Sequence, residues 1–174
     1  MIKAVRKLGD AVAPYGPPDE SRPLGGYLIL ITAYGAALGA VATVVRLTGR
    51  RLPDHVALPD LAMITVATHK ISRLVTKDAV TSPLRSPLTR FDGPAGAGEL
   101  NESVRHRHGL RHAAGELLTC PFCAAVWSAT ALTTGMVLAP RLTRMVAATA
   151  TAVAGADFLH LAYDIVKRRA EGDT

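Results

Sequence analysis

Two long stretches without a charged side chain constrain this fold more than any other feature of the sequence. They run from Pro23 to Val45 and from Leu117 to Pro140. As a helix rising ~1.5 Å per residue, each is long enough to cross the roughly 30 Å hydrocarbon core of a bilayer. Soluble helices of this length rarely lack a charged face, so we favour membrane helices over an Ala-rich soluble bundle.

Two further apolar segments complete a predicted all-α integral membrane four-helix bundle. The segment 56–74 is the weaker one, because Asp60, Lys70 and Arg73 must sit near its ends, where long basic side chains can reach the interface. The segment 145–166 closes on Lys167-Arg168-Arg169. The predicted organisation is a tail (1–22), a transmembrane domain (23–169) with spans 24–45, 56–74, 117–140 and 145–166, a loop (75–116), and a C-terminal tail (170–174).

The basic residues predict an orientation for these spans. Of the 20 lysines and arginines, fifteen fall in the N-terminal tail, in the 75–116 loop or at the span ends on the same side, and five fall in the two short turns on the other side. By the positive-inside rule, both termini and the loop lie in the cytoplasm of a multi-pass cell-membrane protein. The net charge of +6 flanks apolar runs, and aromatic residues make up only 5%, so we exclude nucleic acid as a partner.

The only two cysteines, Cys120 and Cys123, stand three residues apart where the third span begins. Pro121 suits the first turn of a helix, so Cys120 is expected at the cap and Cys123 one turn on, with both sulfurs on one face. Three interpretations stay open: packing at a helix start, a thiol–disulfide couple with Cys120 as the more exposed nucleophile, or a zinc site. Zinc needs about four ligands, which His106, His108, His112 or a second chain would complete.

Polar residues inside the predicted spans form a second group. Asp157, His160 and Asp164 share one face of the fourth span, and His69 and Arg73 share one face of the second. We expect these two spans to meet through these groups, with Arg73 near Asp164. The interpretations are interhelical contact that orients the bundle, or a proton path.

The loop carries a third set of candidate residues. Its prolines predict a rigid, turn-rich path, and its basic side chains suggest contact with anionic lipid headgroups. Acidic residues Glu99, Glu102 and Glu116 are expected to pair with arginines and fold the loop back. The loop residues singled out are Lys77, Asp78, Arg85, Arg90 and Glu116.

Three stretches, His69–Leu74, Thr76–Phe91 and Gly115–Cys123 with Trp127, resemble the bacterial domain-of-unknown-function family 1360. Some members are described as sporulation proteins of the YjcA type. The resemblance covers about Leu58 to Tyr163 and implies a small bacterial integral membrane protein with no established activity, substrate or catalytic residue. His106-Arg107-His108 departs from the Arg-Gly-rich turn usual at this place.

No phosphate-binding loop, dinucleotide fingerprint or nucleophile elbow occurs in the sequence, and we assign no catalytic residue. The favoured function is a non-catalytic scaffold or accessory protein of the cell envelope or of sporulation-like development. The alternatives are a thiol-redox or zinc-binding membrane protein acting through the cysteine pair, and a proton-coupled carrier. A homo-oligomer or a membrane-protein partner stays open, and no cofactor besides the zinc alternative is expected.

Overall fold

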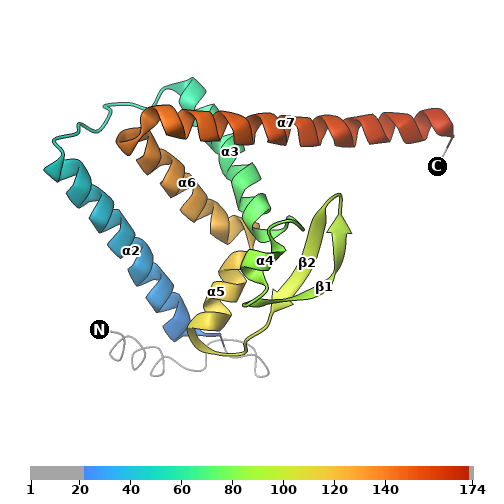
Figure 1. Cartoon of the computed structure of the whole chain (residues 1–174), viewed down its shortest axis with the longest axis horizontal. Coiled ribbons are helices and arrows are strands. Elements are labelled where there is room, and N and C mark those ends of the chain that lie inside the picture. Colours follow the sequence, from blue (N-terminus) through green and yellow to red (C-terminus); the bar gives the residue numbers. More distant parts are fainter. Residues whose placement is uncertain (1–21, 173–174) are drawn as a thin grey trace.

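The computed structural model describes residues 22–172, so the predicted tail lies outside the described part except for Arg22. Figure 1 shows an open, mostly helical molecule in which one long helix, α7, projects past the others at its C-terminal end. A small two-stranded sheet stands beside the lower end of α3. The elements are α2 (Leu24–Leu47), α3 (Leu58–Thr76), α4 (Ser82–Arg85), β1 (Thr89–Gly96), β2 (Glu99–Val104), α5 (Gly109–Thr119), α6 (Pro121–Leu138) and α7 (Pro140–Glu171).

Helix α3 lies at the centre of the packing, between α6 and α7. The buried core cluster draws one or two side chains from each of these three helices: Ile64, Ala67, Leu132 and Ala147. Small alanines at two of these positions let the helix backbones approach closely. Partly buried side chains surround the cluster, namely Met63, Ile71, Met136 and Ala150.

Helix α3 packs against the first part of α7 and diverges from it toward its own C-terminal end (Figure 1). Asp60 accepts two hydrogen bonds from Arg144 at 2.8 and 3.1 Å near the start of both helices. Further along, Thr151 Oγ1 donates to the Met63 carbonyl at 3.0 Å, and Lys70 Nζ reaches Asp157 at 2.6 Å. The two helices therefore meet through charged pairs, and of the polar residues predicted at this contact only Asp157 takes part in one.

Helix α2 packs on the opposite side, against α5 and α6. Tyr34 stacks edge-on against Trp127, with ring centroids 5.1 Å apart, and shares a 2.7 Å hydrogen bond with Thr130. Near its start, α2 approaches α5 so closely that a Cβ on Gly26 would lie 2.7 Å from the Gly109 carbonyl oxygen. A glycine is required at that contact because neither backbone can yield cheaply.

The segment between α3 and α6 is folded, and the all-α prediction was wrong here. Strands β1 and β2 form an antiparallel hairpin that closes through Ala97 and Gly98, with register shifts near Gly93 and Pro94. The hairpin joins the end of α3, where the Leu100 N–H donates to the Lys77 carbonyl at 2.8 Å. The sequence hid these strands because both are mainly polar and β1 carries two glycines and a proline, which strands normally avoid. We call residues 77–119, comprising α4, β1, β2 and α5, the cap.

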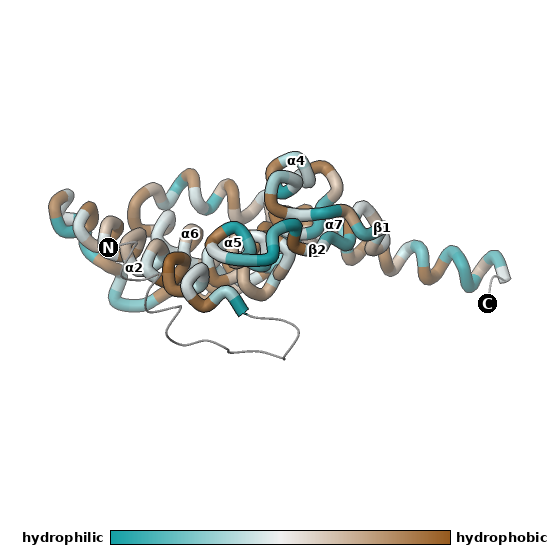
Figure 2. The backbone as a smooth tube through the Cα atoms, turned by 90° about the horizontal axis from the view of Figure 1, so that it is seen from below, coloured by the Kyte–Doolittle hydropathy of each residue, from teal (hydrophilic) through white to brown (hydrophobic). Residues whose placement is uncertain are grey.

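Three described helices are long and apolar enough to cross a membrane: α2, α6 and α7. Only 6–11% of the residues in their apolar windows are buried within the protein, so their surfaces face outward. The predicted second span, now α3, is not among them, because its charges and hydroxyls lower its hydropathy. Figure 2 shows the same division, with hydrophilic colour over the hairpin and mainly brown and white along α2 and α6.

Two helices start at prolines, at other residues than the sequence predicted. The third span was expected from 117, but Leu117 and Leu118 belong to α5, and α6 starts at Pro121 after a break at Cys120. Helix α7 starts at Pro140 directly after α6, earlier than the predicted 145, and runs on to Glu171. A proline fits a first helical turn and cannot continue a preceding helix, so it sets both starts.

Candidate functional site

A cavity of about 780 Å³ lies where α3, α7 and the hairpin tip meet. The five residues singled out as intramembrane polar groups all line this cavity: His69, Arg73, Asp157, His160 and Asp164. Asp78 and Glu99 add two carboxylates from the cap side, and Phe158 stacks on His69 with centroids 6.4 Å apart. The structure thus gathers residues far apart in the sequence at one boundary between helices and cap.

The cations of the cavity are already paired. Lys70 contacts Asp157 at 2.6 Å, and Arg73 binds Glu99 through two parallel bonds, of which Nε to Oε1 measures 2.8 Å. The predicted partner of Arg73 was Asp164, and the structure gives Glu99 instead because the hairpin brings that carboxylate to the end of α3. Within residues 22–172, Asp164 and His160 line the cavity without a hydrogen-bond or ion-pair partner.

The predicted loop residue Arg85 forms the buried anchor of the cap. Its side chain is 1% exposed and donates to Glu102, itself 5% exposed, at 2.6 Å. Its other nitrogens reach the Thr81 hydroxyl at 2.6 Å and the carbonyl oxygens of Val75 and Asp78 at 3.1 and 3.0 Å. One guanidinium therefore ties the end of α3, α4 and β2 together.

Glu116 joins the cap to α2. Its carboxylate accepts hydrogen bonds from Arg22 at 3.0 Å and from the Tyr27 hydroxyl. His112, one turn earlier on α5, lies 3.4 Å from the same carboxylate. This cluster sits at the contact of α2 with α5, so the start of the first apolar helix is held to the cap.

The other loop residues take smaller parts. The Asp78 carboxylate accepts the Val80 N–H at 2.8 Å, which shapes the turn after α3. The Lys77 carbonyl receives the hairpin, as described above, and Arg90 is exposed on β1. These two residues act through backbone position and surface charge respectively.

The two cysteines are free thiols at the start of α6. Cys120 is the N-cap residue, and its Sγ lies 2.7 Å from Cys123 Sγ, so both sulfurs share a face as predicted. The exposure is the reverse of the expectation, since Cys120 is half-buried and Cys123 is exposed. The chain breaks between α5 and α6 at Cys120, whose side chain is partly covered, whereas Cys123 in the first turn of α6 is exposed.

The histidines proposed as further zinc ligands lie elsewhere on the cap. His108 precedes α5 and is exposed, His112 faces Glu116, and His106 contacts the Pro87 carbonyl at 3.2 Å. Within residues 22–172, no three or more His, Cys, Asp or Glu residues gather as a group that could hold a metal ion.

Lys70–Asp157 and Tyr27–Glu116 are among the contacts that the sequence did not predict. Lys70 was assigned to the membrane interface, yet it pairs with Asp157, thirteen residues along from the Arg144 that binds Asp60. The sequence carried little signal of this pairing, because Asp60 and Lys70 are ten residues apart whereas Arg144 and Asp157 are thirteen apart, so no common spacing links the two pairs. No sequence signal marked Tyr27 as a partner of Glu116.

The fold and its charged cavity define a small, mostly helical protein with three helices suited to crossing a membrane. A family model described as "Protein of unknown function (DUF1360)" matches residues 63–163, which is more than half of the chain. The chain therefore belongs to this family, and the resemblance of the three sequence stretches is confirmed. No curated protein and no solved structure matches the chain.

Proposed function

We propose that this protein is a multi-pass membrane protein that acts as a non-catalytic scaffold or accessory protein of the cell envelope or of sporulation-like development. The observation that carries this proposal is the state of the charges on α3. Its three charged residues, Asp60, Lys70 and Arg73, are each bound to an opposite charge from α7 or the hairpin. Groups held this way orient helices, and α3 itself keeps no unpaired lysine or arginine for a substrate.

The same pairing supports α3 as a fourth crossing helix. Helices α2 and α6 run in the same direction, since Tyr34 meets Trp127 and Arg50 meets the Val137 carbonyl. A chain that crosses twice in one direction must return between the crossings, and α3 is the helix between them. Its low hydropathy is tolerable because α6 and α7 cover it and its charges are neutralised in pairs.

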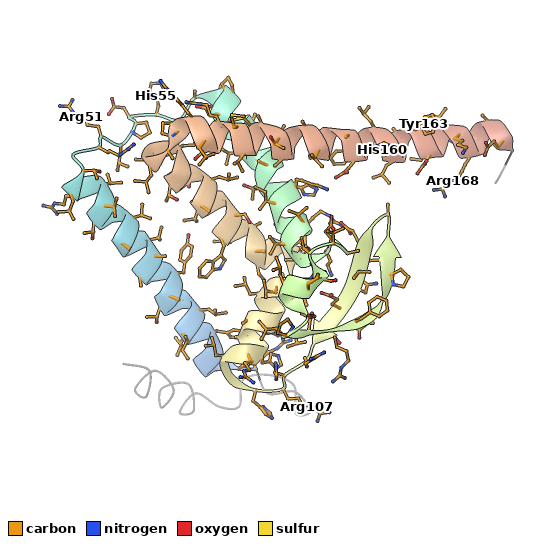
Figure 3. The ribbon with its side chains drawn as sticks, in the orientation of Figure 1. Arg51, His55, Arg107, His160, Tyr163 and Arg168 are labelled. Carbon is orange, nitrogen blue, oxygen red and sulfur yellow. The ribbon has the colours of Figure 1, made fainter. Side chains whose placement is uncertain are left out.

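The ends of the helices support the cap on the cytoplasmic side. Figure 3 shows Arg51 and His55 at the end of the molecule where α3 begins and Arg107 at the opposite end, below α5. Arg51 and His55 belong to the short turn after α2, and Arg107 belongs to the cap. Most of the basic residues were counted on the cap side, and the positive-inside rule places that side in the cytoplasm.

The surface charge of the cap supports contact with anionic lipid headgroups. Glu99, Glu102 and Glu116 are taken up by Arg73, Arg85 and Arg22, so three of the cap's carboxylates are already neutralised. Four arginines of the cap remain exposed, and each contributes roughly 1 kcal/mol of attraction near an anionic surface. They are Arg90, Arg105, Arg107 and Arg111.

A flux measurement separates the scaffold from the carrier alternative. The full chain is reconstituted in liposomes that contain a pH-sensitive dye, and a proton gradient is applied. A scaffold gives the leak of empty liposomes, and Asp164→Asn changes nothing. Proton flux that is abolished by Asp157→Asn or Asp164→Asn contradicts the proposal.

A charge swap tests the structural role of the same residues. Lys70→Asp should lower the melting temperature in detergent, because it places two carboxylates at one contact. Adding Asp157→Lys should restore part of that loss, since the pair is then rebuilt with reversed signs. Equal damage by the single and the double variant would mean that the Lys70–Asp157 contact does not orient α3 and α7.

A further inference from the structure

The two thiols at the start of α6 differ in hydrogen bonding and in exposure, and the scaffold function gives neither of them a role. The Cys120 sulfur accepts two donors from the same residue, the Cys123 backbone N–H at 3.3 Å and the Cys123 S–H at 2.7 Å. Pro121 has no N–H, and the unpaired backbone N–H groups at the start of α6 point toward Cys120, the N-cap residue of that helix. The two sulfurs are therefore inequivalent, because Cys120 accepts both hydrogen bonds and Cys123 donates both.

The exposure of the two sulfurs differs as well. Cys123 is exposed and Cys120 is half-buried behind it. Phe122, between them in sequence, is 87% exposed, so the first turn of α6 is uncovered by the rest of the described chain. A reagent that approaches α6 meets the Cys123 sulfur first.

We propose that Cys120 and Cys123 form a reversible two-electron dithiol–disulfide centre that exchanges with a low-molecular-weight disulfide of the glutathione class. In the first step the Cys123 sulfur attacks one sulfur of that disulfide, and its proton goes to the small thiolate that leaves. A mixed disulfide forms on Cys123, and the first small thiolate leaves. This assignment makes Cys123 the site of entry, the reverse of the sequence expectation.

In the second step the Cys120 sulfur attacks the Cys123 sulfur, and its proton goes to the second small thiolate. The intramolecular disulfide forms and the second small thiolate is expelled, so the protein loses two electrons and the external disulfide gains them. In the reverse direction a small thiolate attacks the exposed Cys123 sulfur, and Cys120 is the leaving group. The Cys123 backbone N–H lies beside Cys120 and can hydrogen-bond that sulfur as it leaves.

The spacing suits this chemistry. The two sulfurs already lie in contact across one helical turn, so ring closure needs no rearrangement of α5 or α6. The proposed cytoplasmic side is a compartment where protein disulfides are transient and are reversed by small thiols. The inference is independent of the scaffold proposal, because it concerns purified protein in detergent and needs no partner protein.

The test uses the full chain in detergent, equilibrated with set ratios of oxidised and reduced glutathione, quenched with acid, alkylated and weighed intact. Wild type should carry two alkyl groups under reducing conditions, and none under oxidising conditions, with a mass lower by two hydrogens. The ratio at half-conversion should not depend on protein concentration, since the disulfide forms within one chain.

The single variants test the direction of attack. Cys120→Ser should accumulate one stable glutathione adduct on Cys123, because no resolving thiolate remains. Cys123→Ser should form its adduct on the half-buried Cys120 about tenfold more slowly. Equal rates, a disulfide between two chains, or stable glutathione adducts on wild type would overturn the proposal. Near-stoichiometric zinc in wild type that is lost in Cys120→Ser/Cys123→Ser would overturn it as well, and melting temperatures confirm that each variant is folded.

Discussion

Replacing Glu102 with glutamine should open the cap, because the carboxylate that balances a buried guanidinium disappears. The Arg85 side chain is 1% exposed, so water cannot solvate its charge once the carboxylate is gone. Breaking a buried pair by removing one partner costs about 3–5 kcal/mol. We expect a loss at the lower end of this range, about 3 kcal/mol, because the glutamine side-chain oxygen can still accept a hydrogen bond from Arg85. The three neutral oxygens that accept from Arg85 also remain in place.

Native-state hydrogen exchange measures this cost where it arises. The reporting amides are those that fasten the cap: Ala79 to the Gly98 carbonyl, Leu100 to Lys77 and Arg105 to Leu88, at 2.8–2.9 Å. A loss of about 3 kcal/mol corresponds to exchange that is roughly a hundredfold faster. The amides of α6 should change far less, since they do not depend on the hairpin.

Asp92→Asn is the matched control, because it removes a carboxylate from the same hairpin at an exposed position. Asp92 accepts one hydrogen bond from Ser103 at 3.0 Å, and its loss should change stability by less than ~0.5 kcal/mol. If Glu102→Gln and Asp92→Asn accelerate exchange equally, the Arg85–Glu102 pair does not anchor the cap, and the reasoning is refuted.

Two further changes test how α2 is attached. Gly26→Ala should cost about 1–3 kcal/mol in detergent unfolding, since its Cβ would meet the Gly109 carbonyl and Ala113, whereas Gly35→Ala on the same helix meets nothing within 4 Å and should be neutral. Glu116→Gln should cost about 1–3 kcal/mol, because it leaves Arg22 and Tyr27 without their shared carboxylate, and thermal unfolding beside the exposed-site control Glu171→Gln measures it. Equal melting temperatures within either pair of variants would show that the contact does not hold α2.

Hydropathy and charge spacing predicted the parts of this fold that obey local rules. Helix α2 begins at the predicted residue, since an uncharged run has little choice of conformation in an apolar medium. The cap was not predicted, because its hairpin depends on long-range pairs such as Arg85 with Glu102 and on glycine-rich turns without alternation. Helix α3 falls between these cases, since its apolar face predicted a helix and its charges concealed how deeply it packs.

The candidate sites divide in the same way. The N-cap position of Cys120 at the start of α6 followed from Pro121 alone, which is a local effect. Which sulfur is exposed depends on how α5 meets α6, and the sequence prediction of that order was wrong. The partner of Arg73 likewise depended on where the hairpin returns, and helical spacing carries no information on that.

The central claim is a membrane protein whose cap faces the cytoplasm, and accessibility of single cysteines tests it most directly. In the Cys120→Ser/Cys123→Ser background, one new cysteine replaces Asp54 in the turn after α2, and another replaces the exposed Asn101 in the hairpin. A membrane-impermeant maleimide added to intact spheroplasts should label Asp54→Cys at once and Asn101→Cys only after the membrane is permeabilised. Labelling of Asn101→Cys in intact spheroplasts, or recovery of the chain in the soluble fraction, would contradict the account.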